Sequence, residues 1–222
     1  MSDQYAGLTW KEGVPVSGRF DDPYYSLADG LAEARHVFLA GNGLPGRFGA
    51  GFRIAELGFG TGLNLLAALG AWRQGGGPGP LSYTSFEAFP MAAADMVRAQ
   101  AAFGELAPLA AELAPFWRDG VRRIELPDLH FTLVVGDARR TLPDWTGMAD
   151  AWFLDGFAPA RNPELWEPAL LAEVARHTAP GGTAATYTAA GHVRRALAAA
   201  GFEVTRVPGF GAKRHMTRAR RP

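Results

Sequence analysis

The apolar positions along the chain follow two spacings, one typical of strands and one typical of helices. Short apolar runs that predict strands recur after residue 50, and stretches with helical spacing separate them. These runs lie at residues 53–57, 81–86, 130–137, 149–155, 183–188, 202–210 and 213–219. Strands that alternate with helices predict an α/β fold with a mostly parallel sheet and helices on both faces. A short glycine-bearing turn joins the final two runs, which favours an antiparallel last strand.

The helices are expected between these strands and also before them. Helical spacing occurs at residues 63–73, 90–103, 105–117, 162–178 and 192–201, with a short helical turn after residue 137 and a plain turn at residues 179–182. Earlier in the chain, residues 8–20 alternate around Gly13 and predict a β-hairpin. Residues 26–41 predict a helix with Leu27 and Leu31 among its apolar positions. We therefore expect an N-terminal hairpin and helix over residues 1–50 and a Rossmann-like core over residues 51–222.

The composition is that of a globular domain without cysteine chemistry. The chain has 222 residues, of which 48% are hydrophobic and 20% charged. The absence of cysteine excludes disulfides, thiolate zinc sites and a cysteine nucleophile, so we do not expect methylation at C5 of a pyrimidine, which usually needs that nucleophile. The five histidines are scattered, and no metal site is expected.

Charge and hydropathy bear on location and partners. No apolar stretch approaches the roughly 20 residues that a membrane-spanning helix needs, and the first residues are polar, so we expect no membrane association and a cytoplasmic protein. A formal net charge of zero argues against nonspecific coating of nucleic acid. Residues 213–222 nevertheless hold five Lys and Arg residues and no acid, and arginine pairs stand at 122–123, 139–140 and 194–195. Each of these basic groups is either solvated surface or, where several converge on one rim, part of an RNA-binding surface.

A glycine turn follows the first core strand. Gly58, Gly60 and Gly62 have the spacing G-x-G-x-G, and Glu56 stands two residues before the first of them. Glycines there allow a tight turn and a close approach of backbone to a ligand, and the next helix offers free N–H groups. The dinucleotide fingerprint is G-x-G-x-x-G. The observed spacing suits a cofactor with a carboxylate and a sulfonium better than one with a pyrophosphate, the alternative being a turn without ligand.

Two further acids stand at the ends of the next two strands. Glu87 can accept hydrogen bonds from both ribose hydroxyls of an adenosine moiety, as the acid after the second strand of a Rossmann unit does; otherwise it is an acid facing a helix N-terminus. Asp137 can accept from an adenine amino group, or can serve as the N-cap of the short turn that follows. Acids at several strand ends of one sheet lie at the edge where α/β proteins bind ligands.

The fourth core strand ends in Asp155-Gly156-Phe157-Ala158-Pro159. A carboxylate followed by Phe and Pro resembles the motif of enzymes that methylate exocyclic amines. Asp155 can accept an N–H hydrogen bond, orient the nitrogen lone pair and help remove the proton. Phe157 and Pro159 can wall the pocket and stack on a flipped base. The alternative for Asp155 is a cap on the next turn; Trp152 and Phe153 are expected in the core.

Together these segments resemble one family, the methyltransferase half of the tRNA 5-methylaminomethyl-2-thiouridine biosynthesis proteins and its stand-alone relatives. The resemblance covers almost the whole chain, and the pair GFGTGLN and DGFAP-x-x-NP-x-x-W is the most specific part of it. It is carried by FDDPYYSLADGLAEARHVFLAGNGL, AELGFGTGLN, SFEAFP, GDARRTLPD, DAWFLDGFAPARNPELW, APGGTAATYTAAGHVRRAL and GFGAKRHM.

The resemblance implies a Rossmann-like class I fold and methylation of 5-aminomethyl-(2-thio)uridine at the tRNA wobble position, with S-adenosylmethionine as cofactor. Asp155 is then the catalytic carboxylate, and the N-terminal segment with Asp29 and Gly30 resembles a lid. The cofactor-binding residues expected are Glu56, Gly58, Phe59, Gly60, Gly62, Asn64, Glu87, Asp137, Ala138 and Asp155. The substrate-binding residues expected are Tyr24, Tyr25, Phe157 and Pro159.

One departure concerns the second activity of the bifunctional relatives. They continue into a flavin-dependent oxidoreductase domain, for which 222 residues leave no room. That upstream activity is expected on a separate protein or on an absent half. Three alternatives to the tRNA reaction stay open: a small-molecule N- or O-methyltransferase on the same fold, an idle nucleotide- or RNA-binding module, and a nicotinamide dehydrogenase. The intact acids speak against the second, and the glycine spacing and final strand pair against the third.

Overall fold

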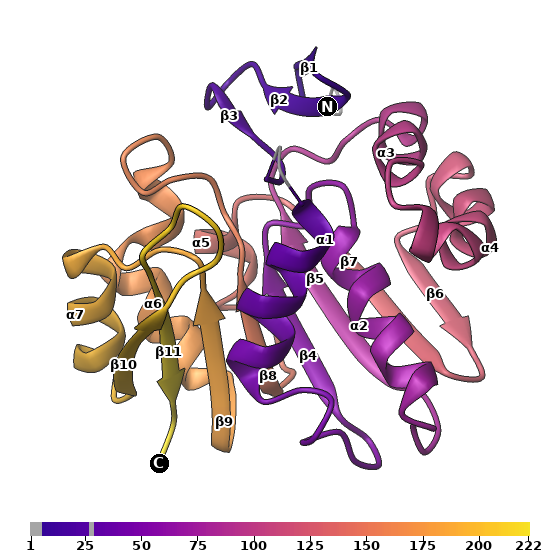
Figure 1. Ribbon diagram of the computed structural model, residues 1–222. Helices are drawn as coiled ribbons and strands as arrows, with labels where there is room; N and C mark the ends of the chain where they lie inside the picture. The colour runs from indigo at the N-terminus through magenta and orange to yellow at the C-terminus, as the bar shows by residue number, and fades with distance from the viewer. Residues whose placement is uncertain (1–5, 27–28) are drawn as a thin grey trace.

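The protein is described by a computed structural model that covers residues 6–26 and 29–222. Its centre is an eight-stranded sheet in the order β10-β11-β9-β8-β4-β5-β7-β6 (Figure 1). The strands are β4 Arg53–Leu57, β5 Leu81–Glu87, β6 Arg123–Leu126, β7 Leu129–Val135, β8 Ala149–Leu154, β9 Thr178–Thr186, β10 Glu203–Pro208 and β11 His215–Arg220. Strands β9, β8, β4, β5 and β7 pair in parallel, whereas β11 is antiparallel to both of its neighbours. The predicted mostly parallel sheet with an antiparallel last strand is confirmed.

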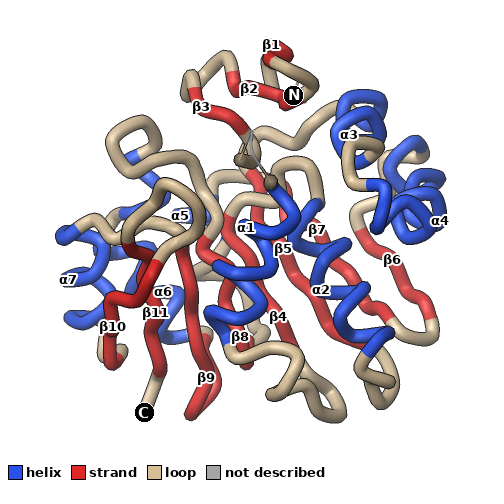
Figure 2. Tube along the Cα trace, viewed as in Figure 1, coloured by secondary structure: helices blue, strands red, loops and turns tan. Residues whose placement is uncertain are grey.

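Helices cover both faces of this sheet, as the blue and red segments of Figure 2 show. They are α2 Leu63–Gln74, α3 Ala93–Gln100, α4 Ala107–Arg118, α5 Ala138–Thr141, α6 Pro168–Arg176 and α7 Gly191–Ala199, with 3-10 turns at Gly104–Leu106 and Pro163–Trp166. Successive strand residues point to opposite faces, so Phe153 packs with the residues of α2 and α4, and Trp152 with those of α6 and α7. Both side chains are fully buried, as expected.

The N-terminal part consists of a small sheet and a helical segment. Strands β1 Leu8–Lys11, β2 Val14–Ser17 and β3 Asp22–Pro23 form an antiparallel sheet that confirms the predicted hairpin. Figure 1 shows this sheet above the end toward which the parallel strands point. Helix α1 Gly30–Ala34 continues through a π-helix, Arg35–Leu39, and a 3-10 turn, Ala40–Asn42, which together run close to the predicted helix; Leu27 lies outside the described residues.

The helical segment packs into the main core. Phe38 lies with its ring centroid 5.5 Å from that of Phe153, and the buried Asn42 amide donates to the carbonyl of Trp152 at 3.2 Å. The helical part of the predicted 1–50 segment is therefore integrated into the main core.

One expectation of the sequence is corrected, and two features are added. Residues 179–182 were predicted as a plain turn, but they lie within β9, where the register shifts against β8. Strand β6 pairs with β7 at the sheet edge and was not predicted, because its four residues alternate too briefly to give a clear period. The basic terminal segment forms the predicted last strand: β11 pairs on both sides, and Arg218 and Arg221 donate to backbone carbonyls of Gly41 and Ala175. Removing residues from Arg218 onward would therefore disrupt the sheet.

Candidate active site

A cavity of about 650 Å³ opens at the carboxyl ends of the parallel strands. It collects residues from the end of β5, from the loops that follow β4, β7, β8 and β9, and from the N-terminal segment. The predicted residues that line it are Tyr24, Tyr25, Gly58, Phe59, Gly60, Asn64, Glu87, Asp137, Ala138, Asp155 and Phe157. Glu56, Gly62 and Pro159 are not among its lining residues. Sheet topology thus brings most of the predicted site together, although its members span more than half of the chain.

The glycine turn between β4 and α2 forms the middle of the cavity wall. Gly58, Gly60 and Gly62 have φ values of +86°, +53° and +74°, which favour glycine. At Gly58 the constraint is also steric, because a Cβ atom there would lie 1.9 Å from the carbonyl oxygen of Asp155. The absence of a side chain at Gly58 therefore lets the ends of β4 and β8 approach each other.

Asn64 connects the two carboxylates of these strands. Its Nδ2 donates to Oδ2 of Asp155 at 2.7 Å and to Oε1 of Glu56 at 2.9 Å. The other oxygen of Glu56 accepts from the Ser85 hydroxyl at 2.6 Å, and Glu56 has no exposed surface. Glu56 therefore lies beneath the cavity wall and supports Asn64 and Asp155, instead of facing a ligand as expected.

Burial dominates the electrostatics of this pair. It raises the pKa of Glu56 to about 8, against the hydrogen bonds from Ser85 and Asn64. Burial also raises the pKa of Asp155 to about 7; the Asn64 bond and Lys213 lower it, and the negative charges of Glu33 and Glu87 raise it. Asp155 can therefore bind and release a proton near neutral pH, as a general base must.

Glu87, the last residue of β5, is fixed by backbone donors. Oε2 accepts from the N–H of Gly60 at 3.0 Å and Oε1 from the N–H of Phe89 at 2.8 Å. Burial raises the pKa of Glu87, and these backbone N–H groups lower it. Because Glu87 lines the cavity, its carboxylate is placed to accept hydrogen bonds from a ligand.

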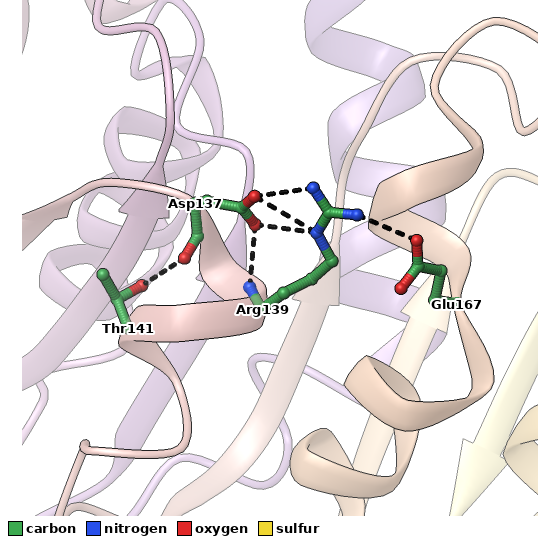
Figure 3. A network of polar contacts seen from close by, with 4 residues as sticks. All are labelled: Asp137, Arg139, Thr141 and Glu167. Atoms are coloured by element: carbon green, nitrogen blue, oxygen red, sulfur yellow. Dashed lines mark hydrogen bonds and ion pairs between the residues drawn. The ribbon is translucent and has the colours of Figure 1, made fainter.

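Asp137 serves as the N-cap of α5, which was one of its two predicted roles (Figure 3). Its Oδ1 accepts from the backbone N–H of Arg139 at 3.0 Å, and the Arg139 guanidinium pairs with Oδ2 at 2.7 Å and with Glu167 at 2.9 Å. The bond to the guanidinium is the main reason why the pKa of Asp137 is lowered. Because Asp137 also lines the cavity, capping does not preclude a ligand role.

Aromatic rings close the cavity on the side of the small N-terminal sheet. The Phe157 ring stacks on Phe20, with centroids 4.8 Å apart, and meets the Tyr24 ring edge-on at 5.0 Å. Tyr25 packs edge-on against Phe103 at 5.0 Å. Phe20 was not predicted in the site, although it begins the FDDPYY segment. Rings from the N-terminal segment and from the β8 loop thus form one apolar wall.

Other cavity residues that escaped prediction include Glu33 of α1, Tyr187 after β9 and Lys213 before β11. All three lie inside segments quoted for the family resemblance, but no local pattern brings them together. Elsewhere, over residues 6–26 and 29–222, no cluster of three or more histidines or acids could hold a metal ion. None of the described helices is long and apolar enough to cross a membrane.

Comparison with known proteins shows the family of the chain. The family described as S-adenosyl-L-methionine-dependent methyltransferase matches residues 104–222. The chain belongs to this S-adenosyl-L-methionine-dependent methyltransferase family, which confirms the expected class of enzyme and its cofactor. Within this class, it is 47% identical to the tRNA 5-methylaminomethyl-2-thiouridine biosynthesis bifunctional protein MnmC of Caulobacter vibrioides, over 97% of the chain and 38% of that protein. It is 48% identical to MnmC of Pseudomonas paraeruginosa, over 97% of the chain and 35% of that protein.

Solved structures show the same fold. MnmC2 from Aquifex aeolicus superimposes with a TM-score of 0.77 at 25% identity, over 98% of this chain and 71% of that one. TrmN from Thermus thermophilus superimposes with a TM-score of 0.52 at 19% identity, over 82% of this chain and 47% of that one, and shares the fold alone. The predicted Rossmann-like class I fold is confirmed. The chain spans little more than a third of the curated relatives that it matches.

Proposed function

We propose that the protein transfers a methyl group from S-adenosylmethionine to the amine of 5-aminomethyl-(2-thio)uridine at the wobble position of tRNA. The observation that carries the proposal is Asp155, held by Asn64 in the cavity wall beside Phe157, with a pKa near neutrality. The names of the MnmC relatives, which specify a 5-methylaminomethyl product, support this choice of acceptor.

The residues that line the cavity fit S-adenosylmethionine. Glu87 faces the cavity and can accept from ribose hydroxyls, Asp137 and Ala138 line the adjacent wall, and Gly58 and Gly60 bring bare backbone to the wall beside Asp155. The acidic groups of the cavity suit a positively charged sulfonium. When bound there, the cofactor supplies an electrophilic methyl group.

Asp155 prepares the acceptor nitrogen. A primary alkylamine is mostly protonated at neutral pH and has no lone pair in that state. Asp155 accepts one proton from the ammonium group on the carboxylate, which leaves a neutral amine and a neutral carboxylic acid. Asn64 holds Oδ2 during this transfer, so Oδ1 is the oxygen that remains for the acceptor.

The aromatic wall suits a nucleobase. Phe157 and Phe20 offer stacking surfaces, and stacking on aromatic side chains is a general way to hold a base that has left its helix. Closure by Tyr24 and the small N-terminal sheet would also exclude water; these segments are the proposed lid. A tRNA substrate implies a cytoplasmic protein.

The acceptor amine must be produced by another activity. We propose that a flavin-dependent oxidoreductase on a separate protein or on another part of a longer chain supplies it, in line with the word bifunctional in the names of the relatives. The basic residues left exposed near the chain end, such as Arg214 and Arg220, can contact tRNA phosphates.

Nucleoside mass spectrometry tests the function. Bulk tRNA that carries 5-aminomethyl-2-thiouridine is incubated with the protein and labelled S-adenosylmethionine, with the Asp155→Ala variant as control. We expect label in 5-methylaminomethyl-2-thiouridine with the wild type only. Label in another nucleoside, or methylation of free small amines but not tRNA, would replace the proposal with the small-molecule alternative.

A further inference from the structure

An ammonium group of the protein itself occupies a subsite of the cavity. Nζ of Lys213 lies 2.7 Å from Oε1 of Glu33 and 4.1 Å from the ring centroid of Tyr187. The Glu33 side chain is only 12% exposed, so the carboxylate is a largely desolvated partner, whereas the Lys213 side chain is 45% exposed. A carboxylate together with an aromatic face is a general binding arrangement for a cation.

The position of this subsite follows from the order of strands. Along the carboxyl edge of the sheet, β7, β5, β4, β8 and β9 present Asp137, Glu87, Gly58, Asp155 and Tyr187 in turn. If the adenosine part lies at Glu87 and Asp137, the subsite lies beyond Asp155, on the opposite side. Lys213 and Glu33 both act electrostatically on Asp155. The subsite therefore shares the cavity with the proposed base and lies on the side away from the adenosine.

The Tyr187 ring is fixed in this position. Its hydroxyl donates to the carbonyl oxygen of Gly156 at 2.8 Å, and Gly156 directly follows Asp155. The ring is thereby tied to the same loop that carries the proposed base. Glu33 is held in place by α1, because Leu31 and Ala34 of the same helix are buried in the core. Both partners of the ammonium group are rigidly held, and Lys213 is the exposed member.

We propose that Glu33 and Tyr187 form the site that receives the ammonium group of the acceptor, and that Lys213 occupies it until the acceptor arrives. This inference rests on the proposed function, because it assumes an alkylammonium acceptor. One primary ammonium replaces another, so the net charge of the site is conserved and Glu33 keeps a hydrogen-bonded cation. No covalent bond changes. Lys213 projects from the exposed turn between β10 and β11, and its displaced ammonium group is free to meet a phosphate of the bound RNA.

The exchange explains why an amine is selected. If an uncharged acceptor displaced Lys213, the Glu33 carboxylate would lose its cation. Leaving a largely buried carboxylate unpaired costs free energy, so such an acceptor binds poorly. In this subsite the ammonium group shares the cavity with Asp155, which takes its proton. Glu33 and Tyr187 are thus specificity residues, and Asp155 remains the base.

A melting experiment without tRNA tests the subsite directly. Lys213→Ala vacates it, so propylammonium chloride should raise the melting temperature of this variant by about 2–4 °C over sodium chloride of equal concentration, when its concentration is several times Kd. The wild type and the double variant Glu33→Gln/Lys213→Ala should show no such difference. An equal response in all three proteins, or none in Lys213→Ala, would overturn the proposal.

A second measurement uses the substrate. The wild type should bind tRNA with 5-aminomethyl-2-thiouridine about 10-fold more tightly than the same tRNA with unmodified uridine, the preference worth one charge-assisted hydrogen bond. Glu33→Gln should abolish this preference. Glu105→Gln is the matched control, since Glu105 pairs with Arg35 of the same helical segment but does not line the cavity, and it should retain the preference. A preference that persists in Glu33→Gln contradicts the subsite.

These results separate the two proposals. A propylammonium response confined to Lys213→Ala, with no labelled wobble nucleoside, would support the ammonium subsite and reject the tRNA function. Wobble methylation without the propylammonium response would support the tRNA function and reject the ammonium subsite.

Discussion

Asn64 donates a 2.7 Å hydrogen bond to Oδ2 of Asp155, so the first turn of α2 holds the carboxylate that follows β8. The two residues are 91 positions apart in the chain. The same amide group also donates to Glu56, which lies beneath the cavity wall. This contact joins the glycine turn to the proposed base, and four predictions build on it and on its neighbours.

Replacing Asp155 should affect turnover far more than cofactor binding. Asp155→Ala is expected to lower the single-turnover rate by about 10²–10⁴, the usual range for general acid–base catalysis. Asp155→Asn keeps a polar group but no basicity and should fall between wild type and Ala. If Asp155 only caps a turn, both variants should instead lose stability and keep normal turnover per folded molecule. Single-turnover methylation and thermal melting of both variants distinguish the two roles.

Removing Asn64 should move the pH dependence of the reaction. The hydrogen bond from Asn64 lowers the pKa of Asp155, so Asn64→Ala raises it further. Since Asp155 must be ionised to accept a proton, the acidic limb of the kcat/KM profile should shift to higher pH by about one unit. Asn64→Gln is the conservative control. An unshifted limb with a uniformly lower rate would mean that Asn64 only shapes the turn.

Glu56 should make the unliganded protein less stable as pH rises. Its pKa is raised to about 8 in the folded state by burial, so the native protein binds this proton more tightly than the unfolded chain does. The resulting stability is fully present below the ordinary carboxyl pKa and is lost as pH rises toward 8. Denaturant unfolding at pH 5 and pH 8 should differ by on the order of a few kcal/mol more in wild type than in Glu56→Gln. Equal pH dependence of the two proteins would contradict this assignment.

Asp137 should contribute to cofactor affinity as well as to the α5 cap. Asp137→Asn retains a capping side chain but loses the negative charge, and we expect it to weaken S-adenosylhomocysteine binding by about 5–10-fold. Arg139→Gln serves as control, because it leaves the Asp137 carboxylate and its backbone bond in place. Calorimetric titration measures both. Wild-type affinity in Asp137→Asn would leave Asp137 with the capping role alone.

Local patterns in the sequence were enough to predict the parallel core strands, the glycine turn and the acids at the strand ends. The reason is that strand and helix periods, and the need for positive φ at Gly58 to Gly62, act over a few consecutive residues. Because parallel strands end at one edge of the sheet, the strand pattern by itself predicts that Glu87, Asp137 and Asp155 converge there.

The direction of side chains and the pairing of distant residues were decided only by the tertiary structure. Glu56 turns beneath the cavity because Asn64 and Ser85 satisfy its oxygens inside the core. Arg218 and Arg221 at the basic end of the chain donate to backbone carbonyls of Gly41 and Ala175, which are far away in the sequence. Lys213 meets Glu33 across 180 positions, where no spacing rule applies. Burial and hydrogen bonding over such distances depend on how the whole chain packs. The sequence pattern therefore predicted which residues belong to the site but not which of them contact one another.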